Sequence, residues 1–149
     1  MRLLISTPAA VVLDLDGVVH LRAEDASGAF GILPGHADFL TALPISVASW
    51  RLASGAEQHC ALRSGVLTVN GGRQIEIATR QAVLGDDLGQ LETEVLHAFR
   101  RASDDEDRAR TEAQRMQLAA IRQICGYLRA DSPIPLLSAA GASRQLPSD

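Results

Sequence analysis

The sequence predicts an antiparallel β-sandwich followed by a C-terminal antiparallel α-helical hairpin. Up to about residue 85, short apolar segments alternate with turn signals, and no segment there has a convincing helical stripe. Beyond Gly85 the apolar residues recur with helical spacing. With 149 residues, of which 46% are hydrophobic and 21% charged, the chain fits one compact domain with a small appendage. We therefore expect a sandwich over residues 1–85, a hairpin over 86–131 and a flexible tail over 132–149.

Short strands are predicted along the whole N-terminal half. Residues 18–23 alternate, which places Val19, Leu21 and Ala23 on one face of a strand. Asn70-Gly71-Gly72 is a hairpin signal after residues 65–70, and Ser54-Gly55 is a second turn. The other strands are expected at residues 3–6, 11–15, 45–52, 58–63 and 75–79. Several short strands separated by turns are typical of an antiparallel sandwich or barrel.

Two helices are predicted after Gly85, at about residues 87–101 and 104–130. The apolar stripe of the first helix consists of Leu88, Leu91, Val95, Leu96 and Phe99. Ser103 and Glu106 have the spacing of a capping box, which predicts the start of the second helix. Helices joined by so few residues usually pack as an antiparallel pair. Pro133 and Pro135 end the helical pattern.

Composition excludes several classes of partner. The net charge is −4, all fourteen basic residues are arginine, and no basic stripe alternates with aromatic residues, so nucleic acid is not expected as a partner. No apolar run approaches the ~20 residues of a membrane span. Cys60 and Cys125 have no metal-ligand spacing and are expected to be reduced thiols. These features predict a soluble, cytoplasmic protein.

Residues 11–19, VVLDLDGVV, offer a catalytic alternative. They resemble the first motif of haloacid-dehalogenase-type phosphatases, in which Asp14 would accept the phosphoryl group, Asp16 would act as general acid and base, and Mg²⁺ would bind between carboxylate and phosphate. That fold requires alternating strands and helices, whereas residues 18–85 predict strands alone. The favoured interpretation is that Asp16-Gly17 forms a hairpin turn. A small Mg²⁺-dependent phosphatase is the alternative.

Other polar residues give no catalytic or metal-binding pattern. The four histidines, His20, His36, His59 and His97, share no metal-ligand spacing. The acidic residues 104–107 lack the glycine and the distal glutamate of a calcium-binding loop, and acids are expected near a helix start. We predict no catalytic residue and no metal site.

Residues 28–43, GAFGILPGHADFLTAL, form the most distinctive segment of the chain. Gly28 and Gly31 flank Phe30, and Pro34-Gly35 is the central pair of a type II turn. No nucleophile accompanies His36. We therefore predict an interface that acts by shape, with Ala29 and Phe30 presented at its tip. The predicted interface residues are Gly28, Ala29, Phe30, Gly31, Pro34, Gly35 and His36.

Three blocks of sequence resemble the ε subunit of bacterial F-type ATP synthases. They are residues 28–42, residues 64–69 (SGVLTV) and residues 78–88 (ATRQAVLGDDL). The departures from the family pattern suggest a divergent, second-copy form. The resemblance implies a non-catalytic rotor subunit that couples ion translocation to ATP synthesis and needs no cofactor. Its implied partners are the γ subunit and the c-ring, with the α/β hexamer contacted through an inhibitory hairpin, at the cytoplasmic face of the bacterial inner membrane.

A nucleotide site is implied by the same resemblance. Asp105-x-x-Arg108-Ala109, with Arg115 seven residues further, is similar to the motif with which some ε subunits bind regulatory ATP. The alternative is a solvated helix face on which Asp105 and Arg108 pair at i, i+3. A third hypothesis for the whole chain is a sandwich binding module without relation to ATP synthases.

Overall fold

The computed structural model describes residues 1–130, so the predicted tail at 132–149, with Pro133 and Pro135, lies outside the described residues. The chain divides into two units, at residues 1–107 and from Arg108 onward. The first unit holds the sandwich and the beginning of the helical part. The second is the remainder of the helix, and each unit is described by itself.

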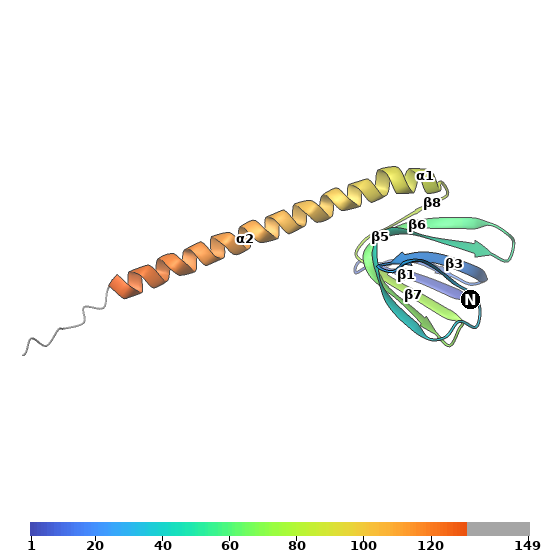
Figure 1. Cartoon of the computed structure of the whole chain (residues 1–149). Coiled ribbons are helices and arrows are strands. Elements are labelled where there is room, and N and C mark those ends of the chain that lie inside the picture. Colours follow the sequence, from blue (N-terminus) through green and yellow to red (C-terminus); the bar gives the residue numbers. More distant parts are fainter. Residues whose placement is uncertain (131–149) are drawn as a thin grey trace, which may run out of the picture. The chain divides into compact units, whose positions relative to one another are not determined.

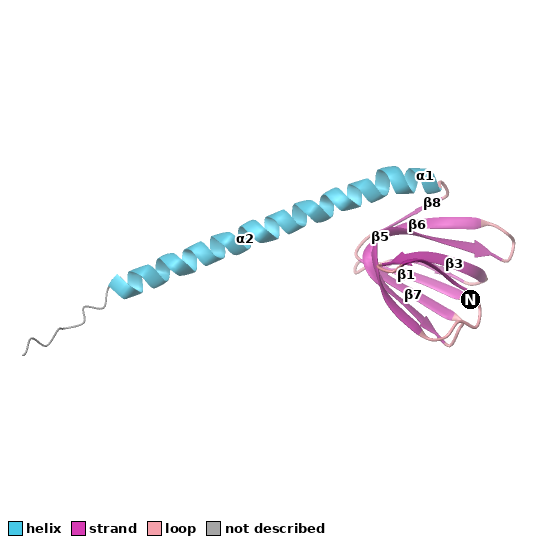
Figure 2. Ribbon diagram, viewed as in Figure 1, coloured by secondary structure: helices cyan, strands magenta, loops and turns pink. Residues whose placement is uncertain are grey.

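Eight strands build the sandwich (Figure 1; Figure 2). They are β1 (Arg2–Ser6), β2 (Val11–Leu15), β3 (Val18–Asp25), β4 (Gly28–Ile32), β5 (Phe39–Leu52), β6 (Glu57–Asn70), β7 (Gln74–Thr79) and β8 (Ala82–Gly85). The hydrogen-bonded order is β2-β1-β7-β6-β5-β3-β4, and β8 pairs with β6. All neighbouring pairs are antiparallel, as predicted, except β1 and β7, which are parallel.

Two long strands hold the two layers together. The strands predicted at 58–63 and 65–70 are one strand, β6, which pairs with β5 from Glu57 to Val69. Its second half pairs with β7 and its first half with β8, so β7 and β8 follow one another along the same edge of β6. The prediction of two strands was wrong because the backbone bends at Ser64, where φ is +57°, without ending the ladder.

The core lies between the layers and contains large, fully buried side chains. The largest include Trp50, Leu3, Ile5, Leu21, Ile32, Leu62 and Leu67. Val18 is fully buried and Val19 is exposed, opposite to the predicted alternation. The pairing of β3 with β5 shifts register between Val18 and His20, and the shift turns Val18 inward in place of Val19.

The segment at Asp16-Gly17 is not a β-hairpin. The two strands that it joins are not neighbours, because β2 pairs with β1 whereas β3 pairs with β4 and β5. The predicted turns at Ser54-Gly55 and Asn70-Gly71-Gly72 are confirmed, since they connect the antiparallel pairs β5–β6 and β6–β7.

The helical part is continuous, in contrast to the predicted hairpin. A short helix α1 (Leu88–Gln90) leads into a π-helical segment η1 (Leu91–Val95) and then into α2 (Leu96–Ala130). Asp87 caps the start, its carboxylate accepting a hydrogen bond from the Gln90 N–H at 3.2 Å. A C-terminal helical region is thus confirmed, but the break expected at residues 102–103 is absent from α2. No glycine or proline lies between Leu91 and Cys125, so nothing in the backbone interrupts the helix there.

Candidate docking surface

The tip of the β3–β4 hairpin is held rigidly by one carboxylate. Asp25 Oδ1 accepts hydrogen bonds from the Ser27 N–H at 2.8 Å and from the Ser27 hydroxyl at 2.6 Å, and Oδ2 accepts the Thr41 hydroxyl at 2.9 Å. These bonds lower the pKa of Asp25, and the bond from the Ser27 hydroxyl has the largest effect. Gly28 has φ +122°, a conformation that glycine adopts without strain. The hairpin tip is therefore a fixed shape.

Phe30 points toward the sandwich, which corrects the prediction that it is presented at the tip. It pairs with the buried Ala23, and its ring meets the Phe39 ring edge-on with centroids 5.6 Å apart. Side chains alternate along a strand, so its neighbour Ala29, paired with the exposed Glu24, faces outward. Ala29 alone is thus the outward side chain of the predicted pair.

The Pro34-Gly35 turn is confirmed and is fastened to a second loop. The His36 N–H donates to the Leu33 carbonyl at 3.1 Å, and Gly35 has φ +81°, as a type II turn requires at this position. The Gly35 N–H donates to the Gly72 carbonyl at 2.9 Å, and the Gly71 N–H donates to Asp38 Oδ1 at 2.7 Å. The loop at 33–38 and the β6–β7 turn are therefore bonded directly to one another.

A second surface lies on the outer face of β5, β6 and β7, and the sequence analysis did not single it out. Ala42, Val66 and Ala78 stand side by side across the three strands, and Ser6 of β1 continues this row. Leu40, two residues before Ala42 on β5 and on the same face of the strand, is 71% exposed, while Val66 is 42% exposed. We call Leu40, Ala42, Val66 and Ala78 the outer row. The sequence does contain a sign of this surface, because β5 has apolar residues at both odd and even positions and therefore on both of its faces.

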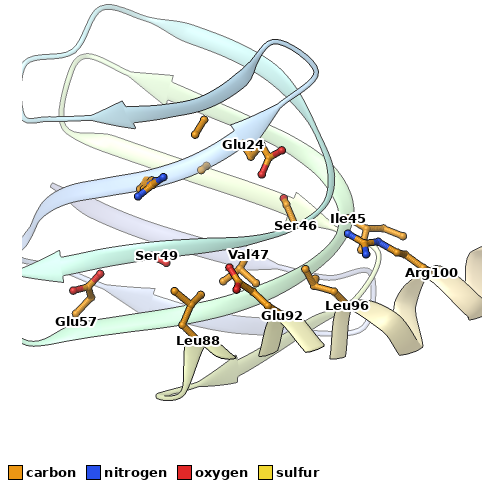
Figure 3. Close-up of a pocket in the computed structure, with 13 residues that line it drawn as sticks. Glu24, Ile45, Ser46, Val47, Ser49, Glu57, Leu88, Glu92, Leu96 and Arg100 are labelled. Atoms are coloured by element: carbon orange, nitrogen blue, oxygen red, sulfur yellow. The ribbon is translucent and has the colours of Figure 1, made fainter. Parts of the chain in front are cut away.

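A pocket of about 280 Å³ lies between β3, β5 and the helical segment 88–100 (Figure 3). Its walls mix arginines and glutamates, among them Arg22, Arg100, Glu57 and Glu92, so no single ligand charge is favoured. Ser49 lines this pocket, and its Oγ lies 2.7 Å from His59 Nδ1, but no carboxylate among residues 1–130 pairs with His59. A catalytic triad is therefore not assembled from the described residues.

The phosphatase alternative finds no support at Asp14 and Asp16. The Arg2 guanidinium binds the Asp14 carboxylate through two hydrogen bonds, of 2.8 Å and 2.7 Å, and so lowers the pKa of Asp14. Asp14 lies on β2, an edge strand that no helix follows. No cluster of three potential metal ligands occurs among residues 1–130.

The three residues of the predicted nucleotide site lie on α2. Asp105 is on the first unit, and Arg108 and Arg115 are on the second. The three residues lie on one helix, and ATP binding at them stays a prediction.

Cys60 and Cys125 are free thiols, and burial raises the pKa of Cys60 to about 11. No helix within residues 1–130 is long and apolar enough to cross a membrane.

Comparisons with known proteins agree with this geometry. Residues 1–85 match the family model of the ATP synthase delta/epsilon chain β-sandwich domain. An ATP synthase epsilon chain 2 of Paraburkholderia xenovorans is 46% identical over 87% of this chain and 93% of its own length. A protein of the same name from Cereibacter sphaeroides is 42% identical over 86% of this chain and 88% of its own length.

Solved structures share the fold at lower identity. A chain of the Euglena gracilis mitochondrial ATP synthase gives a TM-score of 0.54 at 22% identity and covers 72% of this chain and 62% of its own. A chain of the Tetrahymena thermophila mitochondrial ATP synthase central stalk gives a TM-score of 0.50 at 19% identity. The match covers 63% of this chain and 71% of that chain. With the match over the whole sandwich and relatives of nearly full length, the chain belongs to the epsilon-chain family of ATP synthases.

Proposed function

We propose that this epsilon-family chain is the non-catalytic central-stalk subunit of an F-type ATP synthase and helps to couple ion translocation to ATP synthesis. Two relatives that match it over most of their length have names that describe a second epsilon chain. The chain is therefore a subunit of a rotary complex and not an enzyme by itself. It lies peripherally, at the cytoplasmic face of the bacterial inner membrane.

The outer row is the observation that favours docking to the γ subunit. Its side chains are short apart from Leu40, so a flat protein surface can approach the sheet closely across three strands. Exposed apolar side chains that gather in one place on a folded protein mark interaction sites. Because β5 begins at Phe39, the outer row continues directly into the loop of Pro34, Gly35 and His36.

The hairpin tip is proposed to meet the c-ring. Gly28, Ala29 and Gly31 expose backbone and one methyl group, which suits contact with short loops of a ring of subunits. The bonds of Asp25 keep this tip from yielding under load. A rigid tip and a flat apolar face together make the sandwich suitable for transmitting torque.

The helical part is the proposed regulatory element. It would contact the α/β hexamer and restrain ATP hydrolysis, with Asp105, Arg108 and Arg115 as candidate contacts for regulatory ATP. A switch of this kind requires two packings that differ by only a few kcal/mol. The helix start packs on the sandwich through a small cluster of buried residues, Ala61, Leu91, Leu96 and Phe99, and this small apolar contact supports such a small difference.

The docking proposal is tested by placing a charge on the outer row. Leu40→Glu is expected to weaken binding to purified γ subunit roughly ten-fold or more, because an exposed apolar side chain of the row becomes a charge that docking would desolvate. Val19→Glu is the matched control, since Val19 is an exposed valine of β3, a strand that is not part of the row. Binding is measured by calorimetry and folding by circular dichroism. Equal binding of the Leu40 and Val19 variants would contradict the proposed face.

A further inference from the structure

Two arginines of the sandwich meet one carboxylate of α2. Arg63 Nη2 lies 2.8 Å from one Glu106 oxygen, and Arg80 Nη2 lies 3.3 Å from the other. The Arg63 side chain is only 12% exposed, whereas Arg80 is 58% exposed. A single carboxylate is thus divided between two guanidinium groups, one of which is nearly buried.

The buried guanidinium has more donors than this carboxylate satisfies. Among residues 1–130, no acceptor lies in hydrogen-bonding geometry with Nε or Nη2 of Arg63, although Nη2 is within ion-pair distance of Glu106. A buried N–H without an acceptor costs free energy, and the cost is larger for a charged group. Such groups are uncommon in folded proteins, and a bound ion is one explanation. Each Glu106 oxygen already faces one arginine, so the remaining donors of Arg63 call for another acceptor.

The backbone that holds both arginines is fixed. The Arg63 N–H donates to the Gln81 carbonyl at 2.8 Å. The Thr79 hydroxyl lies 2.5 Å from the Ser64 carbonyl oxygen and 3.1 Å from that of Gln81, so it joins β6 to the segment between β7 and β8. The backbone of Arg63 and Arg80 therefore starts from a single fixed corner of the sandwich, so little backbone ordering is needed before the two arginines bind a shared ligand.

We propose that Arg63 and Arg80 form a binding site for a tetrahedral oxyanion, of the class of inorganic phosphate or a terminal phosphoryl group, and that Glu106 occupies this site in the structure. The Nε and Nη2 groups of arginine form a planar fork that matches two oxygens of a phosphate. A third phosphate oxygen remains for Arg80, whereas a carboxylate has only two oxygens for both arginines. An oxyanion would thus satisfy the donors that Glu106 leaves unpaired, and its binding would release Glu106 from the sandwich. Arg80 lines a shallow pocket together with Ala78 of the outer row, but the site uses none of the row's side chains and does not depend on docking to the γ subunit.

Calorimetry of the full chain with sodium phosphate at low ionic strength tests the site. Glu106→Gln is expected to bind phosphate roughly ten-fold more tightly than the wild type, because the competing carboxylate is gone. Arg63→Gln and Arg80→Gln should abolish the binding. The matched control is Arg51→Gln, which removes an exposed arginine of β5 and should bind as the wild type does. Because Arg80 is mostly exposed, its variant is expected to fold even if the Arg63 variant does not.

A second measurement follows the helix directly. Phosphate should increase hydrogen exchange of the amides at residues 100–107 in the wild type but not in Arg80→Gln. A parallel titration with ATP separates the two sources of phosphate. Tighter binding of ATP with the same dependence on Arg80 identifies a nucleotide phosphoryl group, and binding of phosphate alone identifies the free ion. The proposal is overturned if neither the wild type nor Glu106→Gln binds phosphate, or if Arg80→Gln binds as Arg51→Gln does.

Discussion

The sandwich and the start of the helix are held by very different amounts of buried surface. The sandwich core contains fifteen buried residues, among them Trp50 and four isoleucine or leucine residues of β1 and β7 that are at most 1% exposed. The helix start rests on four buried residues, Ala61, Leu91, Leu96 and Phe99, and on the ion pairs of Glu106. Apolar burial stabilises by roughly 25 cal/mol per Å², so the sandwich is the stable part and the helix contact is the weak one. This difference suits a rigid docking domain that carries a detachable element.

The largest expected effect tests the strong side of the comparison. Trp50→Ala removes the largest fully buried side chain and should lower the free energy of unfolding of the sandwich by about 3–5 kcal/mol. Urea denaturation followed by circular dichroism measures the change. Arg51→Ala, at the next position but exposed, should change it by less than about 0.5 kcal/mol. A loss of under about 1 kcal/mol in the Trp50 variant would mean that the core is not the main source of stability.

The next effect tests the weak side. Phe99→Ala should lower the free energy of local unfolding of the helix start, residues 91–107, by about 3 kcal/mol. The urea midpoint of the sandwich should change little. Hydrogen exchange of the amides at residues 91–107, compared with those of β5 and β6, separates the two parts. His97→Ala, on the exposed side of the same helix, is the control. If Phe99→Ala destabilised both parts equally, the two would form one cooperative unit and the comparison would fail.

A smaller effect is expected at the hairpin tip. Phe30→Asp should destabilise the sandwich by about 2 kcal/mol, because Phe30 packs against Phe39 and a carboxylate there would be partly desolvated. Ala29→Asp, one residue earlier and outward-facing, should leave the urea midpoint nearly unchanged and impair assembly of the synthase. Assembly is measured by co-purification with the c-ring. Equal stability of the two variants would contradict the inward orientation of Phe30.

Local chemistry made much of the fold predictable from the sequence. Pro34-Gly35 specified the type II turn because proline fixes one φ and glycine permits the positive one that follows. Ser54-Gly55 and Asn70-Gly71-Gly72 predicted their turns for similar reasons. The helix start followed from the spacing of Leu91, Leu96 and Phe99. Each of these features depends on a few adjacent residues, and pairing between distant segments does not change it.

Features that depend on distant pairing were not predictable from the sequence. The register shift at Val18 and the parallel pairing of β1 with β7 arise between segments far apart in the chain. The outer row exists only because β5, β6 and β7 align Ala42, Val66 and Ala78. At Ser103 a local capping signal was overridden, since the surrounding residues favour an uninterrupted helix. The inward turn of Phe30 likewise depends on its pairing with Ala23.

The smallest effect concerns pH at the hairpin tip. The hydrogen bonds from Ser27 and Thr41 hold the pKa of Asp25 below its ordinary value near 3.9, so the folded state binds this proton less readily than the unfolded state does. The carboxylate therefore contributes stability that is fully present above the unfolded pKa and is lost as pH falls through the folded pKa. In melting curves between about pH 2 and 6, the wild type should lose more stability on acidification than Asp25→Asn. The difference should be confined to the region below about pH 4, and at pH 7 the variant should be the less stable of the two. Parallel curves would mean that the Asp25 bonds do not stabilise the tip, and its rigidity would then rest on the β3–β4 ladder alone.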